Sequence, residues 1–252
     1  MTTGLLDGKI AIITGASRGI GAEAARLFAQ EGAAVVLAAR SADNLARIVD
    51  EIQAAGGQAV AVPTDVGDPA SVEQLVSQAL RVYGRLDVTF NNAGDGHMPV
   101  PLADLAVDDF DRAVRVNLRG VFLAMKYEIP AMLAGGGGAI VNMASTAGLD
   151  GVRGIAGYVA GKHGIIGLSK TAALDYAGRG IRVNVVAPGP VLTERIAALS
   201  EERRQPINNA VPLGRIGLPE EIARTAAWLC SDQASFITGT VLPIDGGRLA
   251  GI

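Results

Sequence analysis

A tyrosine and a lysine four residues apart, Tyr158 and Lys162, are the residues of this sequence best suited to move a proton. At that spacing two side chains share one face of a helix, one turn apart. A free tyrosine titrates near pH ~10, and a nearby ammonium stabilises the phenolate. We therefore expect Lys162 to lower the pKa of Tyr158, so that the phenol can act as a general acid or base at ordinary pH. The same pair also occurs often by coincidence on helix surfaces, so a catalytic role must be supported by other residues of the sequence.

Ser145 strengthens this interpretation because of where it lies. It comes two residues after 139–143, a largely apolar run that we expect to form a strand. Ligands bind beyond the carboxyl ends of strands in open α/β sheets. A hydroxyl there can donate a hydrogen bond to a substrate oxygen as charge develops on it.

A glycine-rich loop stands near the start of the chain. Residues 14–21, Thr-Gly-Ala-Ser-Arg-Gly-Ile-Gly, follow an expected strand and precede an expected helix. Gly15, Gly19 and Gly21 allow a tight turn and close approach of the backbone to a ligand, and the following helix offers free N–H groups to a pyrophosphate. The order of strand, loop and helix favours a dinucleotide site over a plain turn. No G-x-x-x-x-G-K-[ST] motif occurs, so a P-loop nucleotidase is not supported.

The second strand ends in Ala38-Ala39-Arg40-Ser41. A site for NAD places an acidic residue there, to bind the 2′-hydroxyl of the adenosine ribose. A carboxylate would repel the 2′-phosphate of NADP, whereas a guanidinium can bind it through two hydrogen bonds. Arg40, with Ser41 beside it and Arg18 in the glycine loop, therefore favours NADP(H) over NAD(H). The alternative is two solvated surface arginines.

Apolar runs and helical patterns alternate from end to end. The runs are continuous, as in strands buried on both faces of a parallel sheet. We expect strands at residues 9–13, 34–38, 59–62, 86–90, 139–143, 183–186 and 240–243, and helices at 22–30, 44–54, 72–82, 107–133, 158–176 and 220–229. This alternation predicts an α/β, doubly wound parallel sheet with helices on both faces. No linker or internal repeat interrupts residues 1–252, so we expect one domain.

Composition excludes several other classes of function. A net charge of −3 without a basic stripe argues against nucleic acid as a partner. No apolar stretch reaches the roughly 18 residues that span a bilayer, and the N-terminal residues do not resemble a secretory signal. The one cysteine, Cys230, cannot form an internal disulfide, and two histidines offer no metal cluster. We expect a cytoplasmic protein without a metal.

Taken together, these motifs resemble the short-chain dehydrogenase/reductase family over essentially the whole chain. Further matches are Asp65-Val66, Asn91-Asn92-Ala93-Gly94, Asn117 within VNLRG, Ser145 within NMASTAG, and RVNVVAPGPVLTE at 182–194. Any one is weak, but their order and spacing together are specific. The resemblance implies a single-domain Rossmann fold and an oxidoreductase that transfers a hydride between a nicotinamide and a ketone or secondary alcohol, as in a carbonyl reductase.

The resemblance also implies the role of each residue. Tyr158 would be general acid or base, Ser145 would orient the substrate oxygen, Lys162 would hold the nicotinamide ribose, and Asn117 would position a water. The implied cofactor contacts are Gly15, Ser17, Arg18, Gly19, Ile20, Gly21, Arg40, Ser41, Asp65, Val66, Asn91, Ala93, Gly94, Tyr158, Lys162, Pro188, Gly189, Val191 and Thr193.

The substrate and the assembly are less closely defined. The predicted cleft walls, 95–98, 146–155 and the segment after Pro188, are mostly apolar and favour a neutral carbonyl or alcohol substrate. Residues 189–212 are long enough to form a lid over the site. Family members commonly form homotetramers or dimers, and the apolar C-terminal residues would suit such an interface. Two alternatives stay open: an NAD-dependent alcohol or sugar dehydrogenase, and a dinucleotide-binding sensor without turnover.

Overall fold

The computed structural model describes residues 4–251, which form seven parallel strands in the order β3-β2-β1-β4-β5-β6-β7. The strands are β1 (Ile10–Thr14), β2 (Ala34–Ala39), β3 (Gln58–Pro63), β4 (Val88–Asn91), β5 (Gly138–Met143), β6 (Ile181–Pro188) and β7 (Val241–Ile244). All seven expected strands lie within two residues of these bounds, and β6 is longer than expected by two residues at each end. The predicted doubly wound, Rossmann-type α/β domain is confirmed.

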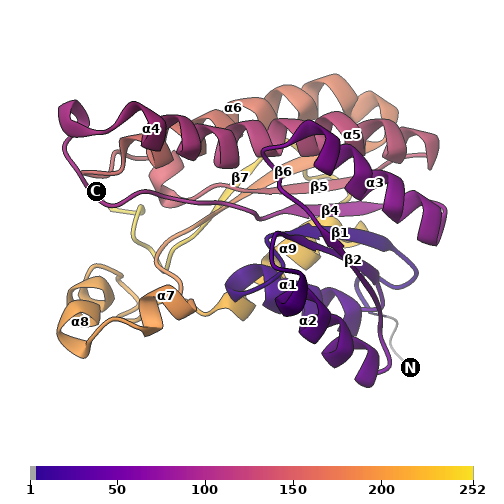
Figure 1. The fold of residues 1–252 in the computed structure, drawn as a ribbon, viewed down its shortest axis with the longest axis horizontal. Coiled ribbons are helices and arrows are strands. Elements are labelled where there is room, and N and C mark those ends of the chain that lie inside the picture. Colours follow the sequence, from indigo (N-terminus) through magenta and orange to yellow (C-terminus); the bar gives the residue numbers. More distant parts are fainter. Residues whose placement is uncertain (1–3, 252) are drawn as a thin grey trace.

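Helices cover both faces of the sheet, as its continuously apolar strands require. One face carries α1 (Gly19–Gln30), α2 (Ala42–Ala54) and α9 (Pro219–Cys230), and the other carries α3 (Pro69–Tyr83), α5 (Gly120–Ala134) and α6 (Ala156–Tyr176) (Figure 1). α4 (Val107–Val114) packs on α6. Within residues 4–251, no helix has both the length and the apolar character to cross a membrane.

The expected single helix over residues 107–133 is in fact interrupted. α4 ends at Val114, a π-helical turn spans Arg115–Arg119, and α5 begins at Gly120. The amide of Asn117 donates a hydrogen bond of 2.8 Å to the carbonyl of Ala113, four residues earlier, and so competes with the backbone ladder at this point. π turns inside helices occur frequently at functional sites.

Two helices were not predicted. α7 (Glu194–Ala197) and α8 (Glu201–Asn209) lie in the segment expected to be a lid, and Figure 1 shows them apart from the helices that cover the sheet. Residues 201–209, Glu-Glu-Arg-Arg-Gln-Pro-Ile-Asn-Asn, contain one aliphatic side chain other than Pro206. An apolar periodicity that would indicate a helix is therefore missing from the sequence.

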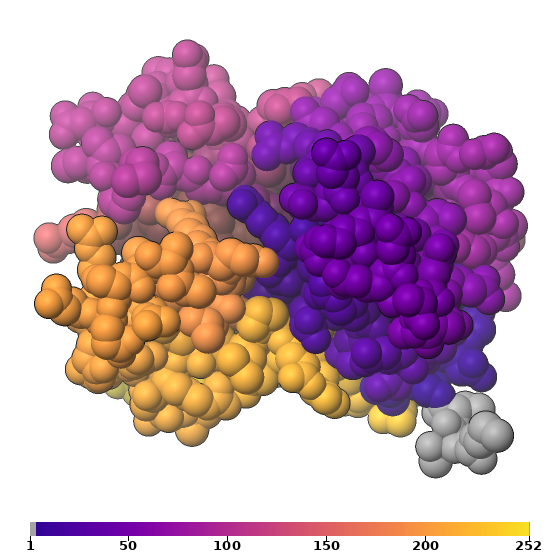
Figure 2. All heavy atoms as spheres, turned by 60° about the horizontal axis from the view of Figure 1, so that its bottom comes forward, coloured from indigo at the N-terminus to yellow at the C-terminus, as the bar shows by residue number. Residues whose placement is uncertain are grey.

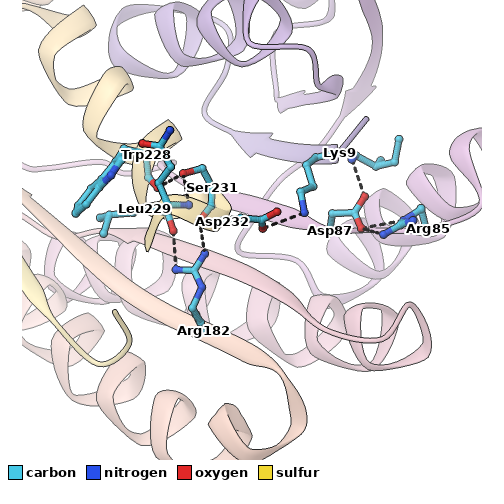
Figure 3. A network of polar contacts seen from close by, with 10 residues as sticks. Lys9, Arg85, Asp87, Arg182, Trp228, Leu229, Ser231 and Asp232 are labelled. Atoms are coloured by element: carbon cyan, nitrogen blue, oxygen red, sulfur yellow. Dashed lines mark hydrogen bonds and ion pairs between the residues drawn. The ribbon is translucent and has the colours of Figure 1, made fainter. Parts of the chain in front are cut away.

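Charged side chains join the strands to a helix at the amino edge of the sheet (Figure 3). Arg182, near the start of β6, donates hydrogen bonds of 2.7 and 3.0 Å to the carbonyls of Leu229 and Ser231 at the C-terminal end of α9. Asp87 accepts the backbone N–H of Ile10 at 2.8 Å. A cation at a helix C-terminus satisfies free carbonyls and the helix dipole. This edge is therefore fixed, and the opposite, carboxyl edge is the one available for ligands.

A buried carboxyl group lies inside the core between α5 and the sheet. Glu128 is 1% exposed, and its Oε2 accepts hydrogen bonds from the Thr89 hydroxyl at 3.1 Å and the Asn91 amide at 2.9 Å. The Asn91 amide also donates to Asn142, whose own amide donates to Ser169. Burial raises the pKa of Glu128 to about 7, despite these hydrogen bonds. Among residues 4–251 no cationic group contributes to the pKa of Glu128, so ionisation of this carboxyl group is costly.

Replacing Glu128 with Gln is expected to stabilise the protein above neutral pH. Because the pKa of Glu128 in the fold is raised to about 7, its contribution to stability is complete below the unfolded value of 4.5 and is lost as pH rises through 7. Gln keeps an oxygen that can accept both hydrogen bonds but never ionises. We expect Glu128→Gln to gain on the order of 2 kcal/mol over wild type at pH 8–9, and little at pH 5, in denaturant unfolding.

The matched control is Glu73→Gln, since Glu73 is exposed on α3. An equal gain for Glu73→Gln, or a gain for Glu128→Gln that does not depend on pH, would contradict the role of burial.

Candidate active site

The candidate site lies where the strand order reverses, between β1 and β4, which pair in parallel from Ala11 and Val88 onward. Chain segments leave the carboxyl ends of these two strands in opposite directions, which opens a crevice suited to a ligand. The loops after the six strands β1 to β6 carry most of the expected site residues at this edge, and the helical segments that follow β4 and β5 carry Asn117, Tyr158 and Lys162.

The glycine loop after β1 has the conformation that its sequence requires. Gly15 and Gly19 have φ angles of +67° and +54°, values that other residues rarely adopt. A side chain on Gly15 would also lie 2.8 Å from the amide nitrogen of Asn92, and one on Gly21 would lie 2.6 Å from it. The Asn92 amide donates a 3.0 Å hydrogen bond to the Thr14 carbonyl. Asn92 therefore fixes the loop from the neighbouring strand.

The N-terminus of α1 holds a carboxylate of this same chain. Oε1 of Glu194, on α7, accepts the backbone N–H of Gly19 at 3.1 Å, and Thr193 lies 3.3 Å from where a Gly19 side chain would begin. Figure 2 shows the orange segment that carries α7 and α8 against the indigo part of the chain. A carboxylate is favourable at this end of a helix, as a phosphate would be.

Tyr158 and Lys162 lie together in the first turns of α6. The Lys162 ammonium is 5.4 Å from the centre of the Tyr158 ring, and Lys162 is 2% exposed. It donates a 2.8 Å hydrogen bond to the carbonyl of Met143, the last residue of β5. The β5 strand thus holds the lysine beneath the tyrosine, and Ser145 follows two residues after Met143.

The pKa of Tyr158 is shifted in the opposite direction to our expectation. Burial raises the pKa of the phenol, while a hydrogen bond with Ser145 and the charge of Arg195 act to lower it. Burial also lowers the pKa of Lys162 to about 7. The expected lowering of the Tyr158 pKa is therefore wrong for the groups of the polypeptide alone, because burial of the phenol outweighs the groups that act to lower its pKa.

Asn117 lies at the centre of the π turn and faces the same point as Lys162. Its amide donates to the carbonyls of Asp95 at 2.6 Å and Ala113 at 2.8 Å. Its Oδ1 is buried and has no hydrogen-bond partner among the described residues. A side chain on Gly94 would begin 3.0 Å from this Oδ1 and 3.4 Å from the Lys162 nitrogen. An acceptor oxygen and an amine therefore converge above Gly94.

Asp65 lies at the other end of the crevice, after β3. Its carboxylate accepts the backbone N–H of Gly67 at 2.9 Å and pairs with Arg115 at 2.6 Å. The pKa of Asp65 is lowered: burial raises it, but the hydrogen bonds from Arg115 and Gly67 and the charges of Arg115 and Arg40 outweigh that effect. Arg40 and Arg18 are both exposed. Arginines thus surround the edge at which the adenosine half of a dinucleotide was expected.

The remaining residues expected to contact the cofactor lie either in a small pocket or in the segment after β6. The pocket, beside β1 and β4, is lined by Thr14, Val66, Asn91, Ala93, Gly120, Val121 and Ala124. Asn91 contributes to this pocket although its amide group is bonded into the core. After β6, the N–H of Gly189 bonds to Ile244 at 3.0 Å, and Val191 forms a bridge with Gly217. Pro188 to Thr193 therefore leave the sheet as a fixed segment that leads to α7.

The structure adds four residues that sequence reasoning did not single out: Asn92, Arg115, Glu194 and Arg195. It also gives His97, which lies in the expected cleft wall 95–98, a hydrogen bond from Gly157. Asn92 belongs to a motif that was noticed, so its position after β4 could have indicated its role. The Glu194 contact joins residues 175 positions apart in the chain. Nothing local in the sequence indicates such a contact.

Comparison with known proteins places this geometry among related chains. Residues 15–248 match the family model described as enoyl-(acyl carrier protein) reductase. The chain is 45% identical over 240 residues to a cyclohexanol dehydrogenase of an Acinetobacter species, covering 95% of this chain and 94% of that protein.

Solved structures share the fold over nearly the full length. A 7α-hydroxysteroid dehydrogenase complexed with NADH and 7-oxo glycochenodeoxycholic acid superposes with a TM-score of 0.92 at 38% identity, covering 96% of this chain and 94% of that one. A second structure is that of a Beutenbergia cavernae protein, proposed to be an NAD(P)-dependent gluconate 5-dehydrogenase, with NADP bound at low occupancy. It superposes with a TM-score of 0.91 at 38% identity, covering 98% of each chain.

Proposed function

The chain belongs to the short-chain dehydrogenase/reductase family, and from this premise we propose that it is an NADP(H)-preferring carbonyl reductase with Tyr158 as its acid/base. As a family member it is an oxidoreductase that acts on alcohol and carbonyl substrates with NAD(P). The observation that carries the finer proposal is the convergence of Tyr158, Lys162 and Ser145 at the carboxyl edge of β5.

The residues present fit a dinucleotide. Gly15 and Gly19 leave space that side chains would fill, and the buried Oδ1 of Asn117 lacks a partner beside Lys162. The glycine loop would hold the pyrophosphate, Asp65 and Val66 the adenine, and Lys162 the nicotinamide ribose. When bound, the nicotinamide supplies or accepts the hydride.

The protein's own residues would donate and accept the proton that accompanies hydride transfer. In reduction, the Tyr158 phenol gives its proton to the substrate oxygen, and in oxidation the phenolate takes one from the hydroxyl. Ser145 donates a hydrogen bond to that oxygen and orients it. Lys162, whose pKa is lowered to about 7, can exchange protons near neutral pH. Asn117 would hold a water between this amine and solvent.

The substrate is proposed to be a largely neutral ketone or secondary alcohol. Apolar side chains of the expected cleft walls are exposed: Met98, Leu149, Val152 and Leu192. Exposed apolar groups of this kind favour apolar ligands. Residues 189–212, which include α7 and α8, are proposed to close over the site as a lid.

A homotetramer or dimer is proposed as the working assembly. Phe122 on α5 and Leu174 on α6 are 47% and 84% exposed, on the two long helices that cover one face of the sheet. Contact between copies through these helices would bury both side chains.

Replacing Glu194 with Gln is expected to strengthen dinucleotide binding. The Glu194 carboxylate occupies the Gly19 N–H at 3.1 Å, where it would compete with the pyrophosphate and repel it. Interactions of single charges with a helix terminus correspond to a two- to fivefold effect, so we expect the Kd for NADPH to fall by about that factor at low salt. Titration of NADPH fluorescence measures this change.

The control for this experiment is Glu202→Gln, an equal change of charge at an exposed position of α8. Weaker NADPH binding in Glu194→Gln would mean instead that Glu194 holds the lid in place over the dinucleotide.

The proposed function is tested by following nicotinamide absorbance with a panel of cyclic ketones, linear ketones and the matching secondary alcohols. NADPH and NADH, and their oxidised forms, are compared at equal concentration. Turnover with a preference for NADPH supports the proposal, and turnover that prefers NADH would favour an NAD-dependent alcohol dehydrogenase. Tight dinucleotide binding without turnover on the whole panel would favour a sensor.

A further inference from the structure

The helix that carries the catalytic tyrosine begins without a cap of its own. α6 starts at Ala156, and its N-cap residue, Ile155, has no side chain that can accept a hydrogen bond. The first N–H groups of a helix have no partner within the helix and need an acceptor from elsewhere. Tyr158 is the third residue of this first turn, so any loosening of the turn moves the phenol.

A histidine from a distant loop supplies the acceptor. Nε2 of His97 accepts the backbone N–H of Gly157 at 3.3 Å, although the two residues are 60 positions apart. Nδ1 of the same ring lies 2.9 Å from the carbonyl of Met98. A carbonyl only accepts and an N–H only donates, so the proton is on Nδ1 and the ring is neutral. His97 is 4% exposed.

The space for this contact exists because Gly157 has no side chain. A Cβ on Gly157 would lie 3.1 Å from the Ala113 Cβ on α4 and 3.4 Å from Nε2 of His97. The loop that carries His97 is itself held on both sides. The Asn117 amide donates to Asp95 at 2.6 Å, and Val100 donates to Gly154 at 2.9 Å. The ring therefore connects a fixed loop to the turn of Tyr158.

We propose that His97 is a positioning residue, which caps α6 from the loop after β4 and so fixes Tyr158 against the substrate. This rests on the proposed function, in which Tyr158 is the acid/base. His97 acts through Gly157 and not on the reacting atoms, since both of its nitrogens are occupied by backbone groups.

The test compares His97→Leu, which removes the acceptor, with His97→Gln, whose amide oxygen can replace Nε2. His163→Leu is the matched control, because His163 is exposed on the same helix and its ring bonds to the carbonyl of Val159 within that helix. The measurements are kcat and KM, and hydrogen–deuterium exchange of residues 155–162.

We expect His97→Leu to lower kcat by about 10- to 100-fold, with the KM for NADPH changed less than about threefold, because misplacement of a catalytic group affects the chemical step. Exchange at residues 155–162 should become faster. His97→Gln should restore kcat to within about threefold of wild type and return the exchange of residues 155–162 to the wild-type rate. His163→Leu should leave both measurements unchanged.

An unchanged kcat and unchanged exchange in His97→Leu would overturn the proposal, as would a His97→Gln variant as impaired as His97→Leu. If His97→Leu does not fold, the kcat and the exchange of His97→Gln against wild type decide it. If wild type itself turns over no substrate, the proposed function fails, and the exchange experiment still tests the cap.

Discussion

Replacing Tyr158 with Phe is expected to lower kcat by about 10³-fold and to leave the Kd for NADPH within about twofold. The substitution removes only the hydroxyl, so the ring that lies 5.4 Å from the Lys162 nitrogen stays in place. Without the phenol, Ser145 can still donate a hydrogen bond to the substrate oxygen, but its aliphatic hydroxyl is a much weaker acid than a phenol, so proton transfer to that oxygen becomes slow. Initial rates with the best substrate of the panel, and NADPH fluorescence titration, measure the two quantities.

The direction of the pH dependence provides a second signature of Tyr158. Because burial raises the pKa of the phenol, the protonated form predominates at neutral pH. Ketone reduction uses that form and should persist through neutral pH, falling only as pH rises past the pKa. Alcohol oxidation uses the phenolate and should increase with pH. Both dependences should be absent from the residual activity of Tyr158→Phe.

Tyr176→Phe is the matched control, since Tyr176 ends the same helix and is likewise partly buried. It should retain wild-type kcat. A Tyr158→Phe variant that keeps more than a tenth of the wild-type kcat would remove Tyr158 from the acid/base role and direct attention to Ser145.

The sheet could be predicted from the sequence because its strands are buried on both faces. Runs such as Ala-Val-Val-Leu-Ala-Ala in β2 follow from that burial, and the helices between them follow from the parallel connections. The helical pattern of residues 107–133 was also correct, but its apolar residues continue through the π turn without a change. That turn depends on hydrogen bonds of one side chain, Asn117, and periodicity does not detect it.

Part of the site could likewise be predicted from the sequence, and part of it could not. Tyr158, Lys162 and Ser145 could be identified because their spacing and their position after strands carry the chemistry. His97 lies in the expected cleft wall 95–98, but its contact with α6 could not be predicted. A histidine after a strand is most often a solvated loop residue, and the N–H that His97 accepts lies 60 residues later. The predicted direction of the Tyr158 pKa shift was wrong for a related reason. The sequence shows a lysine one turn away, but only the structure shows that burial acts on both groups.

Replacing Arg40 with Asp is expected to shift the preference between NADPH and NADH toward NADH by about 100-fold or more. Arg40 follows β2 directly, is exposed, and is close enough to Asp65 for its charge to affect that carboxyl group. A charge-assisted hydrogen-bonded contact contributes up to about 3 kcal/mol, and tenfold in affinity corresponds to about 1.4 kcal/mol. The new carboxylate adds repulsion of a 2′-phosphate and can accept the 2′-hydroxyl of NADH.

The ratio of kcat/KM for NADPH to that for NADH is the quantity to measure, because a loss of folding affects both values equally. Arg81→Asp makes the same change of charge at an exposed position of α3 and controls for net charge. Arg40→Ala should give an intermediate ratio, since it removes the attraction without adding repulsion. An unchanged ratio in Arg40→Asp would show that Arg40 is a solvated surface residue.

Arg18 decides how far the preference rests on Arg40 alone. If both guanidinium groups bind the same phosphate, Arg18→Ala and Arg40→Ala should each weaken NADPH binding, and the binding free energy lost in the double variant should differ from the sum of the two single losses. The double loss exceeds the sum if one arginine compensates for the absence of the other. It is smaller than the sum if the contact needs both arginines at once. Neither substitution should alter NADH binding beyond about twofold, because NADH lacks the 2′-phosphate. Equal losses for both cofactors in Arg18→Ala would place Arg18 beside the pyrophosphate, which the two dinucleotides share, and leave the discrimination to Arg40.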